Sequence, residues 1–319
     1  YFPVPMEEAG AMAAESIREG LQLIRDQKAP ANGYYSVYER GFYFLDGDGR
    51  ELFHPATAVR FGTTIAKGSG KGYSSFYHPD QKRLHVRTVV QEALQLAEAA
   101  ASGEVVLKPG AYECIFPPRA LIELIEPLRH HFDAHLYREG KSVLTGHLGQ
   151  QFFSKQLSIS EDVTHPKQFG VPFDQEGLAR RKVVMVGSGT LKGLLGQGSS
   201  SRGFRDYPVY PENLVVDRGT IPYAGLFKKI RRGIFINKLR YHTLVREKDM
   251  EITGLAAAGS VYIENGRVRG RVGPLRYHDS LISILNSVSD LSREQVLLKD
   301  GELGACLLPY LWISKLRVV

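Results

Sequence analysis

Long apolar runs, cysteine and tryptophan are scarce in this chain of 319 residues, which holds two cysteines and one tryptophan. The longest apolar stretch of note, Leu307–Ile313, is far shorter than the roughly 20 residues that cross a bilayer, so we predict no membrane contact. Cys114 and Cys306 alone cannot form a disulfide framework for a chain of this size. Their scarcity favours a reducing compartment, and we predict the cytoplasm.

The first residues, YFPVPMEEAG, have neither a basic n-region nor an apolar h-region, so we predict no signal peptide. They also lack an initiator methionine, and we expect the natural N-terminus to lie upstream of Tyr1. Hydrophobic residues make up 43% of the chain, enough for one large folded domain or two ordinary ones.

The net charge is +7, and basic residues gather at Lys228–Arg232 and at Arg267, Arg269 and Arg271. The last three alternate along a predicted strand, so they share one face. A solvated face or a surface for an acidic peptide or partner both suit this pattern. Because no recognised nucleic-acid module accompanies the charge, we predict no nucleic-acid partner.

The N-terminal part alternates between helical and strand patterns. Helical spacing of apolar residues predicts a helix over 7–27, and an Ala/Leu/Glu-rich pattern predicts another over 88–101. Alternation over 33–53 predicts a hairpin that turns at Asp46–Gly49. We expect a further strand at 58–66 and a flexible turn at 67–75, where GSGKG departs from a phosphate-binding loop because Ile65 and Gly72 stand at required positions.

The C-terminal part is rich in short apolar runs separated by glycine and proline. A strand at 104–109 marks a joint, and a long helical pattern at 119–139 is interrupted by Pro127. Asn265–Gly266 is a type I′ turn signature, and helices are expected at 225–232 and 279–291. We therefore predict an α+β fold, with a partial helix-and-sheet domain at 1–107 and a β-rich domain with a central helix at 108–319.

The histidines on the interrupted helix could carry chemistry. His131 and His135 are spaced i,i+4 and would lie about 6 Å apart on one helix face, a spacing that can bind a metal. Hydrolysis would also need a glutamate beside the first histidine, but Phe132 stands there. His130 is followed by His131 rather than by glutamate. We interpret these histidines as polar or interface residues, with a noncatalytic metal site as the alternative.

Several short motifs occur together in this chain. They are the turn PFDQEG (Pro172, Phe173, Asp174, Gln175, Glu176 and Gly177), the strand GTLKG at 189–193, the hairpin IENG ending in Asn265 and Gly266, and the late segment GELGACLLPYLWI at 301–313. Together they resemble the TldD/PmbA family, also called modulators of DNA gyrase. The resemblance implies a two-subunit zinc peptidase, in which the TldD-like subunit carries HExxxH on a helix and the TldE-like subunit does not.

The resemblance indicates which subunit this is. Aligned on Gly140, the segment from Ile125 to His130 falls on HExxxH, so that Glu126 and His130 match and Ile125 replaces the first ligand. TldD-like subunits use a late cysteine as a zinc ligand, but the segment around Cys306 has the TldE-like form. We therefore assign no catalytic residue, and regard Glu126, His130, His131, His135 and Cys306 as vestigial metal-site candidates.

The resemblance thus implies a metal-free TldE-like subunit of a heterodimeric zinc peptidase. Zinc is expected in a TldD-like, HExxxH-bearing partner, and the substrate is an extended peptide, either unfolded or a leader segment of a ribosomal peptide precursor. An atypical stand-alone metallopeptidase using His130, His131 or His135 with Cys306 is one alternative, and a noncatalytic peptide-binding protein is another. The segment 307–313, with Tyr310 and Trp312, is either an interface anchor or a core strand.

Overall fold

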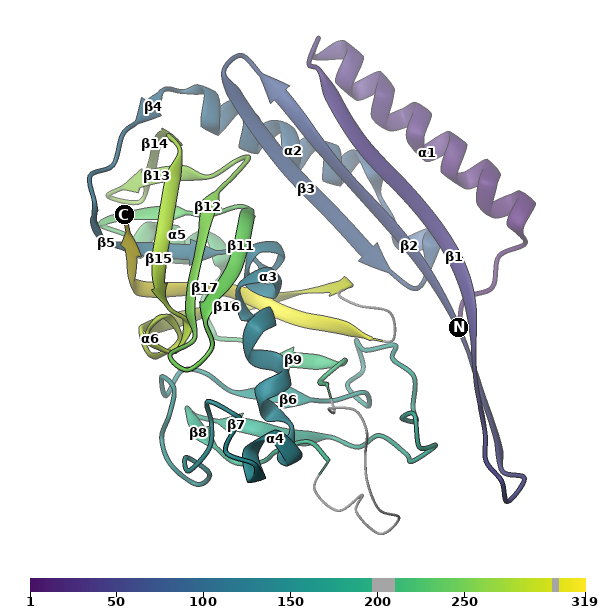
Figure 1. Ribbon diagram of the computed structural model, residues 1–319. Helices are drawn as coiled ribbons and strands as arrows, with labels where there is room; N and C mark the ends of the chain where they lie inside the picture. The colour runs from purple at the N-terminus through teal and green to yellow at the C-terminus, as the bar shows by residue number, and fades with distance from the viewer. Residues whose placement is uncertain (197–209, 300–303) are drawn as a thin grey trace.

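The computed structural model describes residues 1–196, 210–299 and 304–319, and Figure 1 shows them arranged around two β-sheets. The first sheet has three antiparallel strands in the order β1 (Ala31–Leu45), β2 (Glu51–Lys67) and β3 (Gly70–His78). The second sheet has fourteen strands and contains the other strands of the described residues. This mixture of helices and sheets confirms the predicted α+β class.

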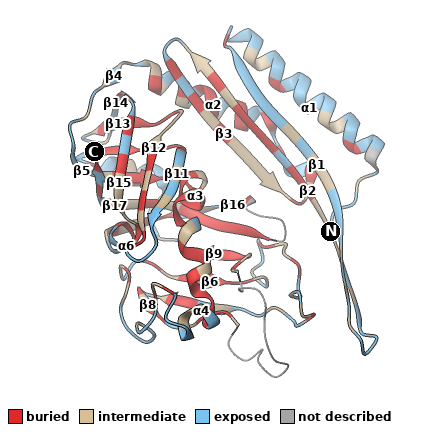
Figure 2. Cartoon of the chain, viewed as in Figure 1, coloured by how far each residue is buried: buried red, intermediate tan, exposed pale blue. Residues whose placement is uncertain are grey.

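Two helices accompany the small sheet, α1 (Met6–Asp26) and α2 (Val86–Ala101), with the short 3₁₀ turn η1 (Gln81–Arg83) before α2. The buried residues of α2 recur at helical spacing, as in Val86, Val90, Ala93 and Ala97. They pack against β2 and β3 and form a core with Val59 and other residues of β2. In contrast, α1 lies at the outside of the molecule and is largely exposed (Figure 2).

The predicted flexible turn at 67–75 is wrong, because most of it is the strand β3. Only Gly68–Ser69 turn the chain, and Gly70 already pairs with Lys67. A Cβ on Gly70 would lie 2.1 Å from the carbonyl oxygen of Ala97, and one on Gly72 would lie 2.0 Å from that of Ala93. These glycines therefore let the backbone of α2 lie directly on β3.

Ten strands of the large sheet form its main path. In spatial order they are β4 (Glu104–Val105), β14 (Arg267–Val272), β13 (Val261–Glu264), β10 (Arg232–Phe235), β5 (Gly110–Phe116), β17 (Ala305–Val318), β9 (Leu214–Val216), β6 (Ile159–Glu161), β7 (Val183–Gly187) and β8 (Thr190–Leu191). The remaining four branch from this path: β11 (Leu239–Arg246), β12 (Glu251–Ala256), β15 (Leu275–Ser280) and β16 (Val288–Lys299).

The helices of this part are α3 (Pro118–Arg129), α4 (Ala134–Arg138), α5 (Tyr223–Lys229) and α6 (Leu281–Asn286), with a 3₁₀ turn η2 (His130–Phe132). The helix expected over 279–291 is shorter, because β16 begins at Val288. The strand expected at 104–109 is only β4. No described helix is long and apolar enough to span a membrane.

The segment 307–313 lies within β17, a strand with β16 and β5 as its antiparallel neighbours. Leu308, Leu311 and Ile313 are fully buried, and Figure 2 shows the surrounding strands as largely buried. The core-strand interpretation is therefore confirmed for these residues. Tyr310 and Trp312 are half-buried, and their contact with another chain stays a prediction. Residues 301–303 of the late motif lie outside the described residues.

The predicted hairpin turn at Asn265–Gly266 is confirmed. Their φ angles are 50° and 73°, and Glu264 pairs with Arg267 on either side of the turn. Positive φ at both central residues is what a two-residue type I′ turn requires. Two arginines of β14 form ion pairs, with Arg269 Nε 3.3 Å from Glu264 and Arg271 paired with Glu104.

Candidate functional site

The central helix α3 begins with Pro118 at its first position, where a missing N–H is tolerated. The expected interruption at Pro127 does not occur, because the helix continues to Arg129. It ends instead in η2, after which Asp133 adopts an extended conformation and its carboxylate caps the N–H groups of His135 and Leu136. A new helix starts there, so the predicted placement of two metal-binding histidines on one helix face is wrong.

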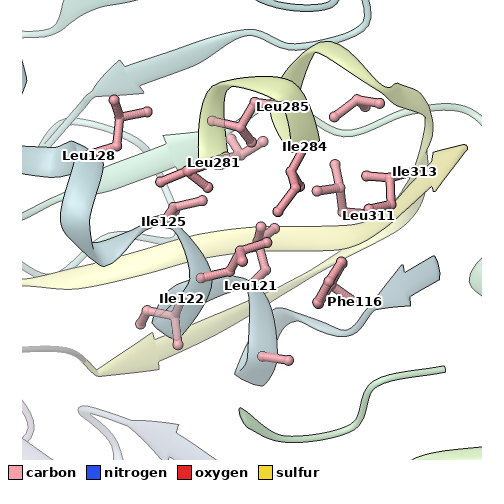
Figure 3. Packing of buried hydrophobic residues seen from close by; sticks show 14 of the residues in the cluster. Phe116, Leu121, Ile122, Ile125, Leu128, Leu281, Ile284, Leu285, Leu311 and Ile313 are labelled. Atoms are coloured by element: carbon pink, nitrogen blue, oxygen red, sulfur yellow. The ribbon is translucent and has the colours of Figure 1, made fainter. Parts of the chain in front are cut away.

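One face of α3 is part of the hydrophobic core. Ile125 is 4% exposed and lies beside Leu281, with Ile284 and Leu285 of α6 close by (Figure 3). Leu121 and Leu128 continue the same buried face. The position that the family resemblance assigns to the first zinc ligand is therefore a core position, surrounded by aliphatic side chains.

Glu126 lies on an exposed part of α3, where neighbouring side chains hold it. Its carboxylate accepts a hydrogen bond from Arg129 Nη1 at 3.0 Å and another from the Tyr210 hydroxyl. The Arg129 side chain is itself buried and donates from Nε to the carbonyl oxygen of Pro211 at 3.2 Å. The glutamate that aligns with a general base is thus bonded to a buried arginine.

His130 and His131 lie side by side at the end of α3, with ring centroids 4.2 Å apart. Both face Glu247, whose Oε1 is 3.6 Å from His130 Nε2 and 3.9 Å from His131 Nε2. In the described part of the chain, these three residues are the one group of His, Cys, Asp or Glu donors close enough to suggest a metal. Glu247 was not among the sequence candidates, because it belongs to the turn after β11 and no local motif marks it.

The proton position on His131 argues against a metal at this group. Its Nδ1 accepts a hydrogen bond from the Val143 N–H at 3.3 Å, so the neutral ring carries its proton on Nε2 and has no lone pair there for a cation. Burial, and then the neighbouring His130, lower the pKa of His131 to about 4, which keeps the ring neutral at pH 7. The donor set present therefore does not fit a catalytic zinc.

The other metal-site candidates lie elsewhere. His135 is exposed and its Nε2 lies 3.1 Å from Glu139. Cys306 is fully buried in the core on β17, as is Cys114 on β5. Among the described residues, neither His135 nor Cys306 joins a group of metal donors. The structure thus does not bring together the residues that the stand-alone metallopeptidase alternative requires.

The PFDQEG motif forms a tight turn that holds the tip of the β1–β2 hairpin. The Asp174 carboxylate accepts hydrogen bonds from the N–H groups of Glu176 and Leu178, each at 2.9 Å. The Glu176 carbonyl accepts one from Arg50 Nη2 at 3.0 Å. A Cβ on Gly177, where φ is 67°, would lie 2.4 Å from the Phe44 ring. Pro172 and Phe173 begin the turn, and Phe173 bridges to Ala179.

Comparison with known proteins decides the family. Residues 109–319 match the family model for the PmbA/TldA metallopeptidase C-terminal domain. The chain belongs to the PmbA/TldD family. No histidine in it is followed by glutamate, so the HExxxH motif of that family's TldD-like members is absent from the sequence.

Three curated relatives match parts of the chain. A protein of Methanocaldococcus jannaschii is 32% identical over 41% of this chain and 35% of its own length. Two proteins named metalloprotease, from Methanothermobacter thermautotrophicus and Archaeoglobus fulgidus, are each 23% identical and match 75% and 70% of this chain. Those matches cover 54% and 56% of the two relatives, so the chain spans about half or less of the length of these three relatives.

Solved structures share the fold. TldE from Thermococcus kodakarensis superposes with a TM-score of 0.84 over 97% of this chain and 74% of that chain, at 22% identity. A protein from Thermotoga maritima, titled as a modulator of a DNA gyrase, gives 0.83 over 99% and 75%, at 19% identity. At these identities the likeness establishes the PmbA/TldD fold alone.

Proposed function

We propose that this chain is a noncatalytic, TldE-like subunit of a heterodimeric zinc peptidase. In this proposal the catalytic zinc and its general-base glutamate belong to a TldD-like partner that bears HExxxH. The complex cleaves unfolded peptides or removes leader segments from ribosomal peptide precursors. A reducing cytoplasm suits the two buried cysteines.

The observation that carries the proposal is the side chain at position 125. A zinc peptidase of this family needs an imidazole at this point of the helix, but Ile125 is buried against α6. The neighbouring Glu126 is bonded to the buried Arg129. On the helix that aligns with HExxxH, the side chain at the first ligand position therefore packs in the core, and the one at the general-base position is bonded to an arginine. The fold around the helix is kept.

A substrate-holding role needs backbone more than catalytic side chains. Strand β11 lies beside α3 and pairs on one side with β12, while no other described strand pairs with it. Extended peptides bind by adding a strand to such an edge, since the unpaired N–H and C=O groups supply the hydrogen bonds. We therefore place the extended peptide along β11.

A partner surface is supported by the tip of the β1–β2 hairpin, which extends away from the rest of the small sheet (Figure 1). Tyr43 is 80% exposed, Leu45 67% and Phe53 53%, and the centroids of the Tyr43 and Phe53 rings lie 4.4 Å apart. Large apolar side chains grouped on a surface are typical of protein interfaces.

Co-expression with an HExxxH-bearing homologue encoded beside this chain tests the proposal. We expect a stable pair burying more than about 1,500 Å², with zinc and peptidase activity present in the pair and absent from this chain alone. Tyr43→Asp should weaken the pair, whereas Val106→Asp, at a separate exposed position, serves as the matched control.

Two results would contradict the proposal. One is that the chain is a monodisperse monomer and does not bind the HExxxH-bearing homologue. The other is tight zinc or peptidase activity in the isolated chain that disappears on His131→Ala.

A further inference from the structure

The small sheet has one face on which neither α1 nor α2 packs. Both helices cover the face that carries Val59, Phe61 and Ile65. Because side chains alternate along a strand, the intervening positions of β1, β2 and β3 point to the other side of the sheet. We call this other side the tyrosine face, since the register places four tyrosines on it: Tyr34, Tyr38, Tyr73 and Tyr77.

The charge on the tyrosine face is positive. Arg40, Arg60 and Lys71 occupy positions of this face, whereas Glu39 and Glu51, the acidic residues of these three strands, occupy positions of the helix-covered face. Arg60 and Lys71 are exposed, and neither forms an ion pair with a described carboxylate. The face therefore attracts anions.

Arg60 lies among three of the tyrosines. Its guanidinium carbon is 5.9 Å from the centroid of the Tyr34 ring. Burial raises the pKa of Tyr34, Tyr38 and Tyr77, and the charge of Arg60 opposes the rise at each of them. A Cβ on Gly62 would lie 2.7 Å from the Tyr34 ring, so this glycine lets the ring lie across β2 beside Arg60.

A second cation reaches the tyrosine face from the large sheet. Lys238, directly before β11, places its Nζ 4.1 Å from the centroid of the Tyr73 ring. The neighbouring Asn237 donates from Nδ2 to the Tyr73 carbonyl oxygen at 3.0 Å, which fixes the start of β11 against this face. Tyr73 pairs with Thr64, four residues from Arg60 along β2, a separation of about 13 Å along the strand. A peptide that lies along β11 thus meets the tyrosine face at Lys238.

The arrangement of the cations favours carboxylates over the bases of a nucleic acid. Single-stranded nucleic acids bind by stacking bases on aromatic rings, but cations already lie over the rings of Tyr34, Tyr38 and Tyr73. A guanidinium beside a ring still offers several N–H donors at its edge, and their geometry matches a carboxylate. In an extended peptide, side chains four residues apart point to the same side and are also about 13 Å apart.

From these features we infer that the tyrosine face binds an acidic stretch of an extended peptide, whose glutamate or aspartate side chains meet Arg60 and Lys238. The inference rests on the peptide-holding role of the proposed function and adds which peptides are held.

Binding of three capped octapeptides, in which alanine alternates with glutamate, glutamine or lysine, tests this. The glutamine peptide keeps the length and shape of the glutamate peptide and removes its charge. Titration of the full chain by calorimetry at low salt should show the glutamate peptide binding about tenfold more tightly than the glutamine peptide, since charge-assisted contacts account for a difference of that order. The lysine peptide should bind most weakly. At about 0.5 M salt the preference should shrink, because exposed charges are then screened.

Two variants make the test specific to the tyrosine face. Arg60→Gln, at an exposed position, should remove most of the preference for glutamate and leave binding of the glutamine peptide unchanged. Lys238→Gln, from a different element, should reduce the preference about threefold, as for one exposed charge pair. Arg267→Gln, at an exposed position of β14, removes the same charge elsewhere and is the matched control that should change nothing.

Equal binding of the glutamate and glutamine peptides, a preference that survives Arg60→Gln, or no binding of any peptide would each overturn the inference. An octathymidylate that binds more tightly than the glutamate peptide, and loses its binding in Arg60→Gln, would overturn it too, because the face would then be a nucleic-acid surface.

Failure of this inference is separable from failure of the proposed function. A chain that pairs with an HExxxH homologue but does not discriminate between the peptides keeps the function and loses the acidic preference. A chain that shows the Arg60-dependent preference without pairing keeps the peptide site and loses the heterodimer.

Discussion

Strands β1 and β17 have nearly the same length, 15 and 14 residues, but opposite surroundings. No residue of β1 is buried, and the strand pairs with β2 alone, although it is rich in tyrosine and phenylalanine. Most of β17 is buried, with strand neighbours on both sides. The composition of a strand therefore does not decide its burial. What decides it is whether other elements cover it.

The same contrast holds for the two parts of the chain. The large sheet surrounds one extensive core that includes α3, α6 and β17, and the family match from 109 to 319 covers it. The small sheet has a modest core beneath α2. A cavity of about 170 Å³ beside α1 and β1 is lined without a charged side chain, unlike the cavity of about 550 Å³ between α3 and β11, which Glu123 and Glu126 line. We expect the large sheet to carry most of the stability of the chain and the exposed β1 to serve contacts.

The largest expected effect comes from the core of the large sheet. Ile125→Ala should destabilise the chain by about 4 kcal/mol, because it removes a buried aliphatic side chain and leaves a cavity against α6. Urea unfolding followed by circular dichroism measures this. Val268→Ala, at an exposed position of β14, is the control and should change the free energy of unfolding by less than about 0.5 kcal/mol. A loss for Ile125→Ala as small as that expected of the control, below about 0.5 kcal/mol, would show that position 125 is not a core position.

Acid should weaken the large sheet through His131. Its pKa falls from 6.5 in the unfolded chain to about 4 in the folded one, so the unfolded chain binds the proton more readily. The stability that this group contributes is complete above pH 6.5 and is lost as the pH falls toward 4. The difference amounts to up to about 3 kcal/mol.

Unfolding free energies measured from pH 7 to pH 4 check this effect of His131. His131→Gln keeps an acceptor for the Val143 N–H and should flatten the slope. Leu148→Gln, at an exposed position without an ionisable side chain, should leave the slope as it is. An unchanged slope in His131→Gln would mean that the ring is not held neutral by burial.

Local signals in the sequence predicted those features that depend on local chemistry. Asn265–Gly266, helix α2 and the hairpin turn at Asp46–Gly49 follow from backbone preferences that act within a few residues. The helical pattern predicted over 119–139 does not continue, because Asp133 caps a new helix and so separates His131 from His135.

Features set by distant contacts were not predictable in this way. The glycines at 70 and 72 suggest flexibility in sequence, but they are required by the backbone of α2, which lies across β3. Glu247 approaches His130 only because the β11–β12 hairpin packs beside α3. No spacing in the sequence reports such a contact.

A smaller and more local loss is expected in the small sheet. Gly72→Ala places a Cβ 2.0 Å from the Ala93 carbonyl oxygen, so α2 must move away from β3, at an expected cost of about 2 kcal/mol. Hydrogen exchange should show lost protection in β1–β3 while β17 amides keep theirs. Gly47→Ala, in the open hairpin turn, should be neutral. Equal loss of protection in β17 would mean that the two sheets unfold together.

The smallest effect concerns the turn between β13 and β14. Gly266→Val should destabilise the chain by about 1–2 kcal/mol, because a β-branched residue resists φ near 73° and its Cβ would lie 3.0 Å from Lys228 Cα. Gly266→Asn meets the same contact but tolerates the left-handed region, so its melting temperature should lie between those of the valine variant and the native chain. The difference between the two variants isolates the backbone strain from the contact with α5. If the Gly266→Val variant has the same melting temperature as the native chain, the turn at the edge of the large sheet contributes as little to stability as the exposed strand β1. The contrast between the two sheets is then confined to the core around α3 and β17.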